Sequence, residues 1–175
     1  MSRITLQPIR RSDGPDLVIA NRESRAHHRP YADPFQDMDG FHLWYDQLIT
    51  TPTVALLARN ASEEGAKGGI VGVFTFSQIA LGNFRSAYLG YYGQAAFAGR
   101  GLMTEALKSA VAYAFEELRL HRIEANIQPE NHRSIALAKR CGFEKEGYSP
   151  LYLKIAGEWR DHERWTRLAK NSASL

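Results

Sequence analysis

Two kinds of apolar spacing alternate along the chain. Short runs rich in β-branched and aromatic residues predict strands, whereas apolar residues that recur every three or four positions predict helices. The runs predict strands over residues 4–9, 54–58, 70–76, 87–92, 121–127, 148–155 and 163–168. The helical spacing predicts helices over residues 16–24, 39–49, 102–118 and 131–140. Because the early strands are neighbours in sequence and the later ones alternate with helices, we expect an α+β fold with a mainly antiparallel, partly mixed sheet.

Turn-forming and polar residues mark the connections between these elements. Residues 25–40 contain two prolines and mixed charge, which predicts a loop, and residues 60–69 (NASEEGAKGG) predict a hairpin loop. The tripeptide Ala156-Gly157-Glu158 joins the last two predicted strands. No repeat and no linker divides the chain. We therefore expect one domain over residues 1–170, followed by a flexible tail over residues 171–175.

Composition and charge limit the classes of protein that fit this pattern. The chain has 175 residues, of which 44% are hydrophobic, 23% charged and 11% aromatic, as in soluble globular domains. The single cysteine, Cys141, excludes a disulfide framework within the chain and any cysteine-based metal cage. The histidines show no zinc-type spacing, so we predict no metal. The net charge of +3 favours anionic ligands but does not by itself indicate nucleic-acid binding.

The sequence also bears on where the protein works. No apolar run reaches about 18 residues, which predicts that the chain does not span a membrane. Its first residues, MSRITLQP, lack the apolar core of a secretory signal. A single cysteine is compatible with a reducing compartment. Together these features predict a cytoplasmic protein.

The segment with the strongest indication of chemistry is the glycine turn over residues 98–104 (AGRGLMT). It lies between a predicted strand and the longest predicted helix. Glycines allow the backbone to approach a ligand closely, and the N–H groups and positive potential at a helix N-terminus attract anions. Arg100 adds a positive charge. This combination predicts a site for a phosphate or pyrophosphate group.

The turn alone leaves several ligand classes open. A P-loop requires Lys-Ser/Thr after its last glycine, which is missing here, so nucleotide hydrolysis is disfavoured. A dinucleotide fold requires a third glycine where this chain has Thr104, although Glu124 lies about 20 residues further on, where a ribose-binding acid is expected. The other two interpretations are a coenzyme A pyrophosphate turn and a plain strand–helix turn.

Three segments together resemble a known enzyme family. They are the glycine turn, the start of the next helix at Asn131-x-x-Ser134-x-x-Leu137, and the segment GFEKEGY that begins at Gly142. They resemble the GCN5-related N-acetyltransferase (GNAT) superfamily and, within it, the RimJ/RimL group of ribosomal-protein-alanine N-acetyltransferases. The strings GNFRSAYLGYY, GRGLMTEAL, HRIEANIQPENHRS and GFEKEGYSPLYLKIAGEWRDH carry this resemblance over roughly residues 70–165.

The resemblance implies a fold and a cofactor site. The fold is a mixed, mostly antiparallel twisted sheet, flanked by helices, whose two central parallel strands, expected over 87–92 and 121–127, splay apart and hold acetyl-CoA. The end of the first splayed strand should pair its backbone with the pantetheine arm through Tyr91, Tyr92 and Gly93. The turn should bind the pyrophosphate through Ala98, Gly99, Arg100, Gly101, Leu102, Met103 and Thr104. Ala98 and Met103 depart from the family's signature positions, but the contacts involve mostly backbone N–H groups.

The resemblance also implies catalytic roles. Asn131 occupies the position that hydrogen-bonds the cofactor arm. Many members carry a tyrosine as general acid where this chain has Ala138, whereas RimL-like members use the helix serine, which matches Ser134. The glutamate proposed as base in such members aligns with Leu153, so a base cannot be assigned by matching. Glu124, acting through water, is our candidate base, and an acid of the N-terminal loop such as Asp33 is the other.

Each of these residues also has a purely structural interpretation. Ser134 can simply bond the backbone of its helix, and Asn131 is a good helix N-cap residue. Glu124 can be a solvent-facing residue of its strand. His27 and His28 are interpreted as loop residues, and the basic segment 22–29 as a solvated loop or as a contact for the acceptor or for ribosomal RNA.

The implied reaction is direct acetyl transfer from acetyl-CoA to a primary amine. A protein N-terminal amine, with a pKa near 8, needs less help from a base than a lysine side chain near 10.4. We therefore expect a protein N-terminus, such as that of a ribosomal protein, as the acceptor, and a monomer or homodimer. The alternatives are acetylation of a small amine, such as an antibiotic or polyamine, and a coenzyme A-binding or ribosome-associated factor without enzyme activity.

Overall fold

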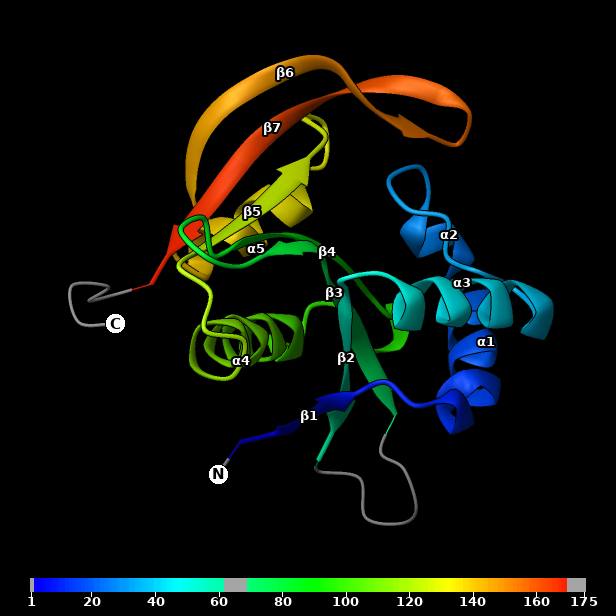
Figure 1. Ribbon diagram of the computed structural model, residues 1–175. Helices are drawn as coiled ribbons and strands as arrows, with labels where there is room; N and C mark the ends of the chain where they lie inside the picture. Colours follow the sequence, from blue (N-terminus) through cyan, green and yellow to red (C-terminus); the bar gives the residue numbers. More distant parts are fainter. Residues whose placement is uncertain (1, 62–68, 170–175) are drawn as a thin grey trace.

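A computed structural model describes residues 2–61 and 69–169 as a seven-stranded sheet flanked by helices (Figure 1). The sheet order is β1-β2-β3-β4-β5-β7-β6. The strands are β1 (Ile4–Pro8), β2 (Val54–Asn60), β3 (Ile70–Ala80), β4 (Ser86–Gly93), β5 (Arg122–Ile127), β6 (Glu144–Ile155) and β7 (Glu158–Leu168). The predicted tail over 171–175 and most of the predicted 60–69 loop lie outside the described residues.

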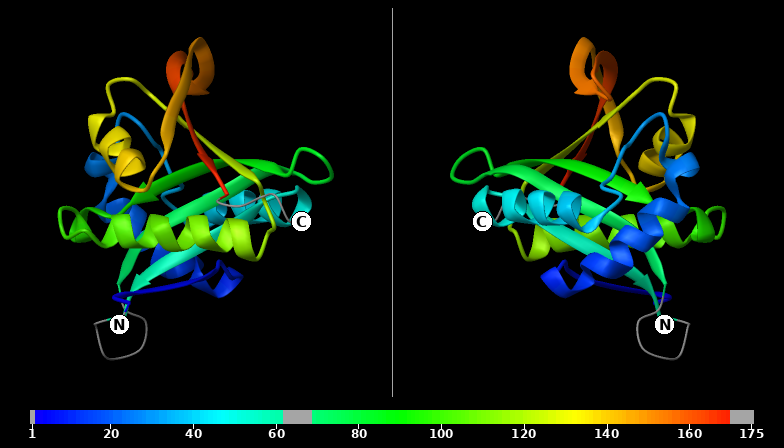
Figure 2. Two further views of the ribbon diagram at one scale, coloured as in Figure 1. Left: turned by 90° about the vertical axis from the view of Figure 1, so that its left-hand side faces the viewer. Right: turned by 90° about the vertical axis from the view of Figure 1, so that its right-hand side faces the viewer.

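Helices cover both faces of the sheet. They are α1 (Gly14–Glu23), α2 (Arg25–His28), α3 (Met38–Thr50), α4 (Leu102–Glu116) and α5 (His132–Arg140), with short 3₁₀ turns η1 (Arg11–Asp13) and η2 (Ala95–Phe97). Figure 2 shows α4 in front of the sheet in one view and α1 and α3 in front in the opposite view. No helix of the described chain is both long and apolar enough to cross a membrane.

Alternation along the strands divides the core into two layers. Leu56 and Phe74 pack in the cluster that contains α4, whereas Leu57 and Val73 pack in the cluster that contains α1 and α3. All four side chains are buried. Because successive strand residues point to opposite faces, both faces of β2 and β3 must be apolar, which explains their continuous apolar runs.

The two central strands are parallel over a short stretch only. β4 pairs with β5 from Ser86↔Arg122 to Tyr88↔Glu124, and the pairing then stops, although β4 continues to Gly93. All the other strand pairs are antiparallel. The expected α+β fold, with a mostly antiparallel sheet and splayed central parallel strands, is therefore confirmed.

Two stretches differ from the sequence prediction. Residues 25–40 were predicted to be loop, but they contain α2 and the start of α3, where the Asp37 side chain caps the helix by accepting from the Gly40 N–H at 2.7 Å. Both strands of the last hairpin begin before their predicted starts at residues 148 and 163, namely at Glu144 and Glu158. Its charged residues obscure the strand pattern, yet they pair across it, as Lys145 does with Glu163 at 2.5 Å.

Candidate active site

A cavity of about 410 Å³ opens where β4 leaves β5. Its walls come from the end of β4, the glycine turn, α5 and the segment that contains α2. Its volume lies within the range of small-molecule sites in proteins. Eight of the residues expected to bind the cofactor line it, namely Tyr91, Tyr92, Gly93, Ala98, Gly99, Met103, Asn131 and Ser134. Arg100, Gly101, Leu102 and Thr104 belong to the same turn and helix start but are not among the lining residues.

The edge of β4 offers backbone groups to this cavity. The Gln94 N–H donates to the Val71 carbonyl at 2.9 Å, so hydrogen-bonded pairs with β3 fall at alternate residues. Gly93, opposite Gly72, lies at a position whose N–H and C=O point away from β3. Tyr91, opposite Phe74, lies at the same kind of position. These groups face the gap that β5 leaves. The Gly93 carbonyl oxygen already lies 3.0 Å from His28 Nε2, and the other groups can pair with an extended ligand as a further strand would.

The glycine turn is bent in a way that exposes its amides. Gly99 has φ +74° and Gly101 has φ +76°, the left-handed region that glycine adopts without strain. Gly101 is the N-cap of α4, and its carbonyl accepts from the Thr104 and Glu105 N–H groups. The first amides of the helix have no partner within the helix. They and the helix dipole form an anion site of the kind that a pyrophosphate needs.

A tyrosine and a serine meet inside the cavity. The Tyr91 hydroxyl lies 2.8 Å from Ser134 Oγ and 3.3 Å from the Ser134 carbonyl oxygen. Burial raises the pKa of Tyr91 to about 12, partly opposed by the hydrogen bond with Ser134. The phenol is therefore protonated at neutral pH and can donate to Ser134, which leaves the serine proton free for a further acceptor. The sequence assigned only the backbone of Tyr91 to the site.

Asn131 fixes the position of Ser134. Its Oδ1 accepts from the Ser134 backbone N–H at 3.2 Å and caps α5. The side-chain NH₂ of Asn131 is not used in that bond. Asn131 can thus cap the helix and still donate to a ligand in the cavity.

Replacing Asn131 separates these two roles. N131A is expected to lower the free energy of unfolding by about 1 kcal/mol, because the cap is lost. N131D keeps an acceptor for the cap but loses the NH₂ donor, so we expect stability near the wild type and weaker acetyl-CoA binding. Urea unfolding and a binding titration of both variants test this. Equal destabilisation by the two variants would show that the cap does not depend on the Asn131 acceptor.

Glu124 is not brought to this cavity. Its carboxylate lies 3.1 Å from the Arg122 guanidinium, which also pairs with Glu146, and its side chain is 13% exposed. Arg122 further donates to the Thr166 hydroxyl. Glu124 is therefore held in a side-chain network across β5, β6 and β7 and is not among the residues that line the cavity.

His28 is a cavity residue that the sequence interpretation treated as a loop residue. It is 5% exposed, its ring packs edge-on against Tyr92 with centroids 5.0 Å apart, and its Nε2 lies 3.0 Å from the Gly93 carbonyl oxygen. A carbonyl oxygen only accepts, so Nε2 carries the hydrogen. Nδ1 is buried and has no hydrogen-bond partner within residues 2–61 and 69–169. His28 thus lines the cavity and carries a buried acceptor nitrogen that no described residue uses.

Burial makes the stability of the fold depend on pH through His28. Burial lowers its pKa, the hydrogen bond to Gly93 and the charge of Asp33 raise it, His27 lowers it, and the net direction is down. As pH falls through about 6.5 the unfolded chain binds a proton first, so native stability falls. We expect the free energy of unfolding to drop more for wild type than for H28Q between about pH 7.5 and about pH 5. Parallel urea-unfolding curves for the two proteins would contradict a buried neutral His28.

Comparisons with known proteins agree with this geometry. Residues 3–144 match the family described as Acetyltransferase (GNAT) domain. An Escherichia coli [ribosomal protein uS5]-alanine N-acetyltransferase is 50% identical over 93 residues, which cover 53% of this chain and 48% of that protein. The chain thus matches about half the length of this curated relative.

Solved structures show the same fold over most of the chain. Mycobacterium smegmatis RimJ, solved with CoA-disulfide, has a TM-score of 0.80 at 27% identity and covers 95% of this chain and 82% of its own. A Vibrio cholerae spermidine N-acetyltransferase, solved with CoA and spermine, has a TM-score of 0.78 at 22% identity and covers 96% of both chains. With the family match over residues 3–144, the chain belongs to the GNAT family of N-acetyltransferases.

Proposed function

We propose that this protein transfers an acetyl group from acetyl-CoA to the N-terminal α-amine of a protein, such as a ribosomal protein. The observation that carries this choice of acceptor is the charge of the cavity. Of the described residues that line it, none is Asp or Glu, whereas Arg133 and Arg140 are cationic. A polycation such as spermidine would find no carboxylate to pair with among these lining residues, which disfavours its binding. A peptide N-terminus carries a single amine, so the repulsion between it and these two arginines is smaller.

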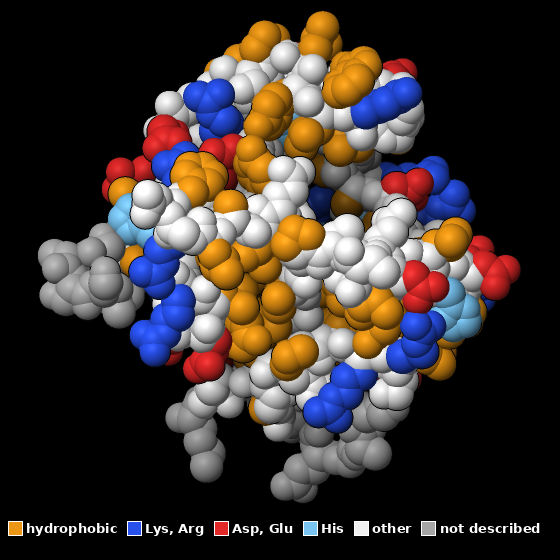
Figure 3. Space-filling view, in the orientation of Figure 1, with side chains coloured by type: hydrophobic (Ala, Val, Ile, Leu, Met, Phe, Trp, Pro, Cys, Tyr) orange, Lys and Arg blue, Asp and Glu red, His pale blue; other side chains and the backbone are white. Residues whose placement is uncertain are grey.

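The surface beside the cavity also suits a peptide. The β6–β7 hairpin reaches toward the side of the molecule that carries α2 (Figure 1). Hydrophobic side chains gather over this hairpin at the top of Figure 3, and Leu151, Leu153 and Trp159 are exposed. Tyr31 ties the segment after α2 to the β5–α5 connection through the Glu130 carbonyl oxygen at 3.0 Å. Apolar side chains next to a small cavity can hold the residues that follow an N-terminal amine.

The chain's own residues can perform each proton step. The neutral amine attacks the thioester carbonyl carbon, and the proton that the nitrogen loses passes to Nδ1 of His28, held in its acceptor form by Gly93. The carbon–sulfur bond breaks, and the sulfur takes a proton from the Ser134 hydroxyl. The Tyr91 hydroxyl can then supply a proton to Ser134 Oγ. The N–H groups of the β4 edge can donate to the thioester oxygen as negative charge develops there.

The basic segment 22–29, predicted to contact the acceptor or RNA, is partly used inside the fold. His28 is buried, the Arg22 Nε donates to the Gln36 carbonyl oxygen, and Arg29 lies 3.8 Å from Asp33. Arg25 is exposed. We keep the acceptor contact as part of the proposal because His27 and His28 line the cavity.

An acceptor panel tests the proposal. Thiol release from acetyl-CoA would be followed with alanine- and serine-starting peptides, the same peptides blocked at the N-terminus but carrying a lysine, and spermidine. We expect release only with free N-termini. Release with spermidine alone would show that the acceptor is a polyamine and not a protein N-terminus. Release with the blocked lysine peptides would show that the enzyme acetylates lysine side chains instead. Binding of acetyl-CoA without release from any acceptor would contradict the α-amine assignment as well.

A further inference from the structure

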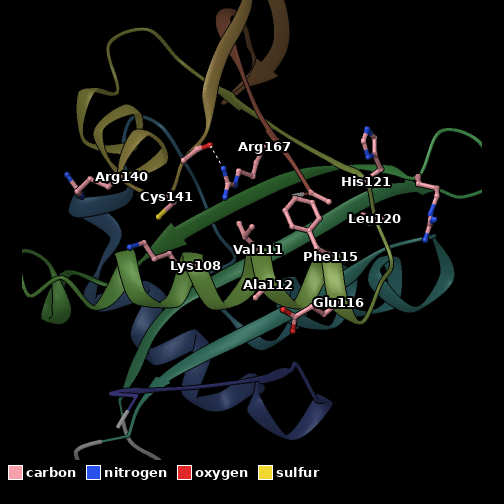
Figure 4. A pocket seen from close by; sticks show the side chains of 13 residues that line it. Lys108, Val111, Ala112, Phe115, Glu116, Leu120, His121, Arg140, Cys141 and Arg167 are labelled. Atoms are coloured by element: carbon pink, nitrogen blue, oxygen red, sulfur yellow. Dashed lines mark hydrogen bonds between the residues drawn. The ribbon is translucent and has the colours of Figure 1, made fainter. Parts of the chain in front are cut away.

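A second cavity of about 710 Å³ lies along α4, on the side of the helix that faces the end of α5 and the last residues of β7 (Figure 4). It shares one lining residue, Arg140, with the cavity described above. Its other residues do not line the first cavity, although the Cys141 thiol lies 3.6 Å from the Thr104 carbonyl oxygen at the start of α4. The lining of this second cavity therefore needs an explanation of its own.

The charge of the second cavity is one-sided. Its lining includes four cationic side chains against one acid, Glu116, and the four come from the β3–β4 connection, α4, α5 and β7, as Arg85, Lys108, Arg140 and Arg167. Figure 4 shows Lys108, Arg140 and Arg167 around Cys141 at one end. Burial raises the pKa of the Cys141 thiol, and these same three cations act to lower it, which shows that their charges converge there.

Arg167 is the member of this cluster whose hydrogen-bond donors are only partly satisfied. Its Nη1 donates to the Gly142 carbonyl oxygen at 3.1 Å, but its Nε is buried and has no hydrogen-bond partner in the described chain. Other partly buried arginines are paired with carboxylates: Arg59 with Asp13, and Arg122 with Glu124. Buried donors and charges in proteins are normally satisfied. Arg167 lines the cavity and forms no carboxylate pair within residues 2–61 and 69–169, so its charge is available to an anion there.

Between these cations the cavity has an apolar wall, although Glu116 and His121 also line it. Val111, Phe115 and Leu120 form the apolar wall, and Figure 4 shows the Phe115 ring between the Arg167 end and the His121 end. A convergent set of cations beside an aromatic ring is the combination that binds nucleotides, because phosphate oxygens accept from arginine and lysine while the base packs on the ring. A simple inorganic anion would leave this apolar wall unused.

We propose that this second cavity binds a nucleotide phosphate, independently of acetyl-CoA. The phosphate contacts Lys108 and Arg167, which line this cavity and not the first one, and the base packs against Phe115. The site adds a ligand to the protein that the acetyl-transfer reaction does not require. It stands whether or not the acceptor proposed above is correct.

The test is a calorimetric titration of the protein with GDP in the presence of saturating CoA, so that the acetyl-CoA cavity is already filled. We expect saturable binding that is about tenfold weaker in K108Q and in R167Q. R119Q is the matched control, because Arg119 is an exposed cation next to the end of α4 that does not line the cavity. Lys108 is also exposed, so K108Q tests the site even where R167Q disturbs the contact with Gly142.

Each other result overturns the proposal. Loss of GDP binding when CoA is added would place the nucleotide in the acetyl-CoA cavity. Equal binding by K108Q, R167Q and wild type would show nonspecific attraction to a basic surface. Pyrophosphate that binds as tightly as GDP would reduce the site to an anion site without a base pocket. Absence of any saturable binding of GDP would remove the site altogether.

Discussion

Replacing His28 with glutamine is expected to lower kcat by about 100- to 1,000-fold, within the range that a positioned general base contributes. The amide NH₂ of glutamine can take the place of Nε2–H and still donate to the Gly93 carbonyl oxygen, which Nε2 of His28 approaches to 3.0 Å. What glutamine removes is Nδ1, the buried nitrogen without a partner in the described chain. Acetyl-CoA affinity should therefore stay close to that of the wild type while turnover falls.

The kinetics of H28Q distinguish a base from a structural residue. Single-turnover rates and acetyl-CoA binding would be measured for wild type, H28Q and H42Q, the last as a control because His42 is exposed on α3. Because burial lowers the pKa of His28 from the ordinary histidine value, the wild-type rate should fall only on the acid side of that value, as His28 gains a proton, and H28Q should lack that limb. A wild-type kcat in H28Q, or a loss confined to KM, would assign His28 to packing and leave the base to another group.

The sequence predicted the parts of this molecule that local patterns control. Leu107, Ala110 and Ala114 recur at helical spacing and are buried in α4, as the periodicity requires. The glycine turn was recognisable because left-handed φ at Gly99 and Gly101 is a local property. Asn131 and Ser134 were found together because their spacing at a helix start is itself the signal.

The sequence did not predict what depends on distant partners. His28 looks like a loop residue because its neighbours are polar, and its burial comes from Tyr92 and Gly93, which are remote in sequence. For Glu124, in contrast, the sequence does contain a local signal. Residues two apart in a strand share a face, so Arg122 could be expected to pair with it. Lys108 and Arg167 line the same cavity because of where the fold places α4 and the end of β7, which no local pattern reveals.

Replacing Ser134 with alanine is expected to lower kcat about 100-fold, because the departing sulfur loses its proton donor. The fold should be kept, since Asn131 caps the backbone N–H of residue 134, which alanine retains. Y91F should cost about tenfold, because Tyr91 reaches the reaction only through the 2.8 Å contact with Ser134 Oγ. S109A, which removes a serine hydroxyl bonded to the Glu105 carbonyl on α4, is the matched control.

The double variant S134A/Y91F decides whether the two hydroxyls act as one unit. If Tyr91 serves only to supply Ser134, the double variant turns over at the rate of S134A, and the coupling free energy equals the whole effect of Y91F. If the fold-losses in kcat of the two single variants multiply in the double variant, Tyr91 contacts a reacting atom itself. A wild-type kcat in S134A would show that the sulfur leaves without a proton from the Ser134 hydroxyl. Ser134 would then have only a structural role in α5. Single-turnover measurements at saturating acetyl-CoA separate these outcomes from changes in binding.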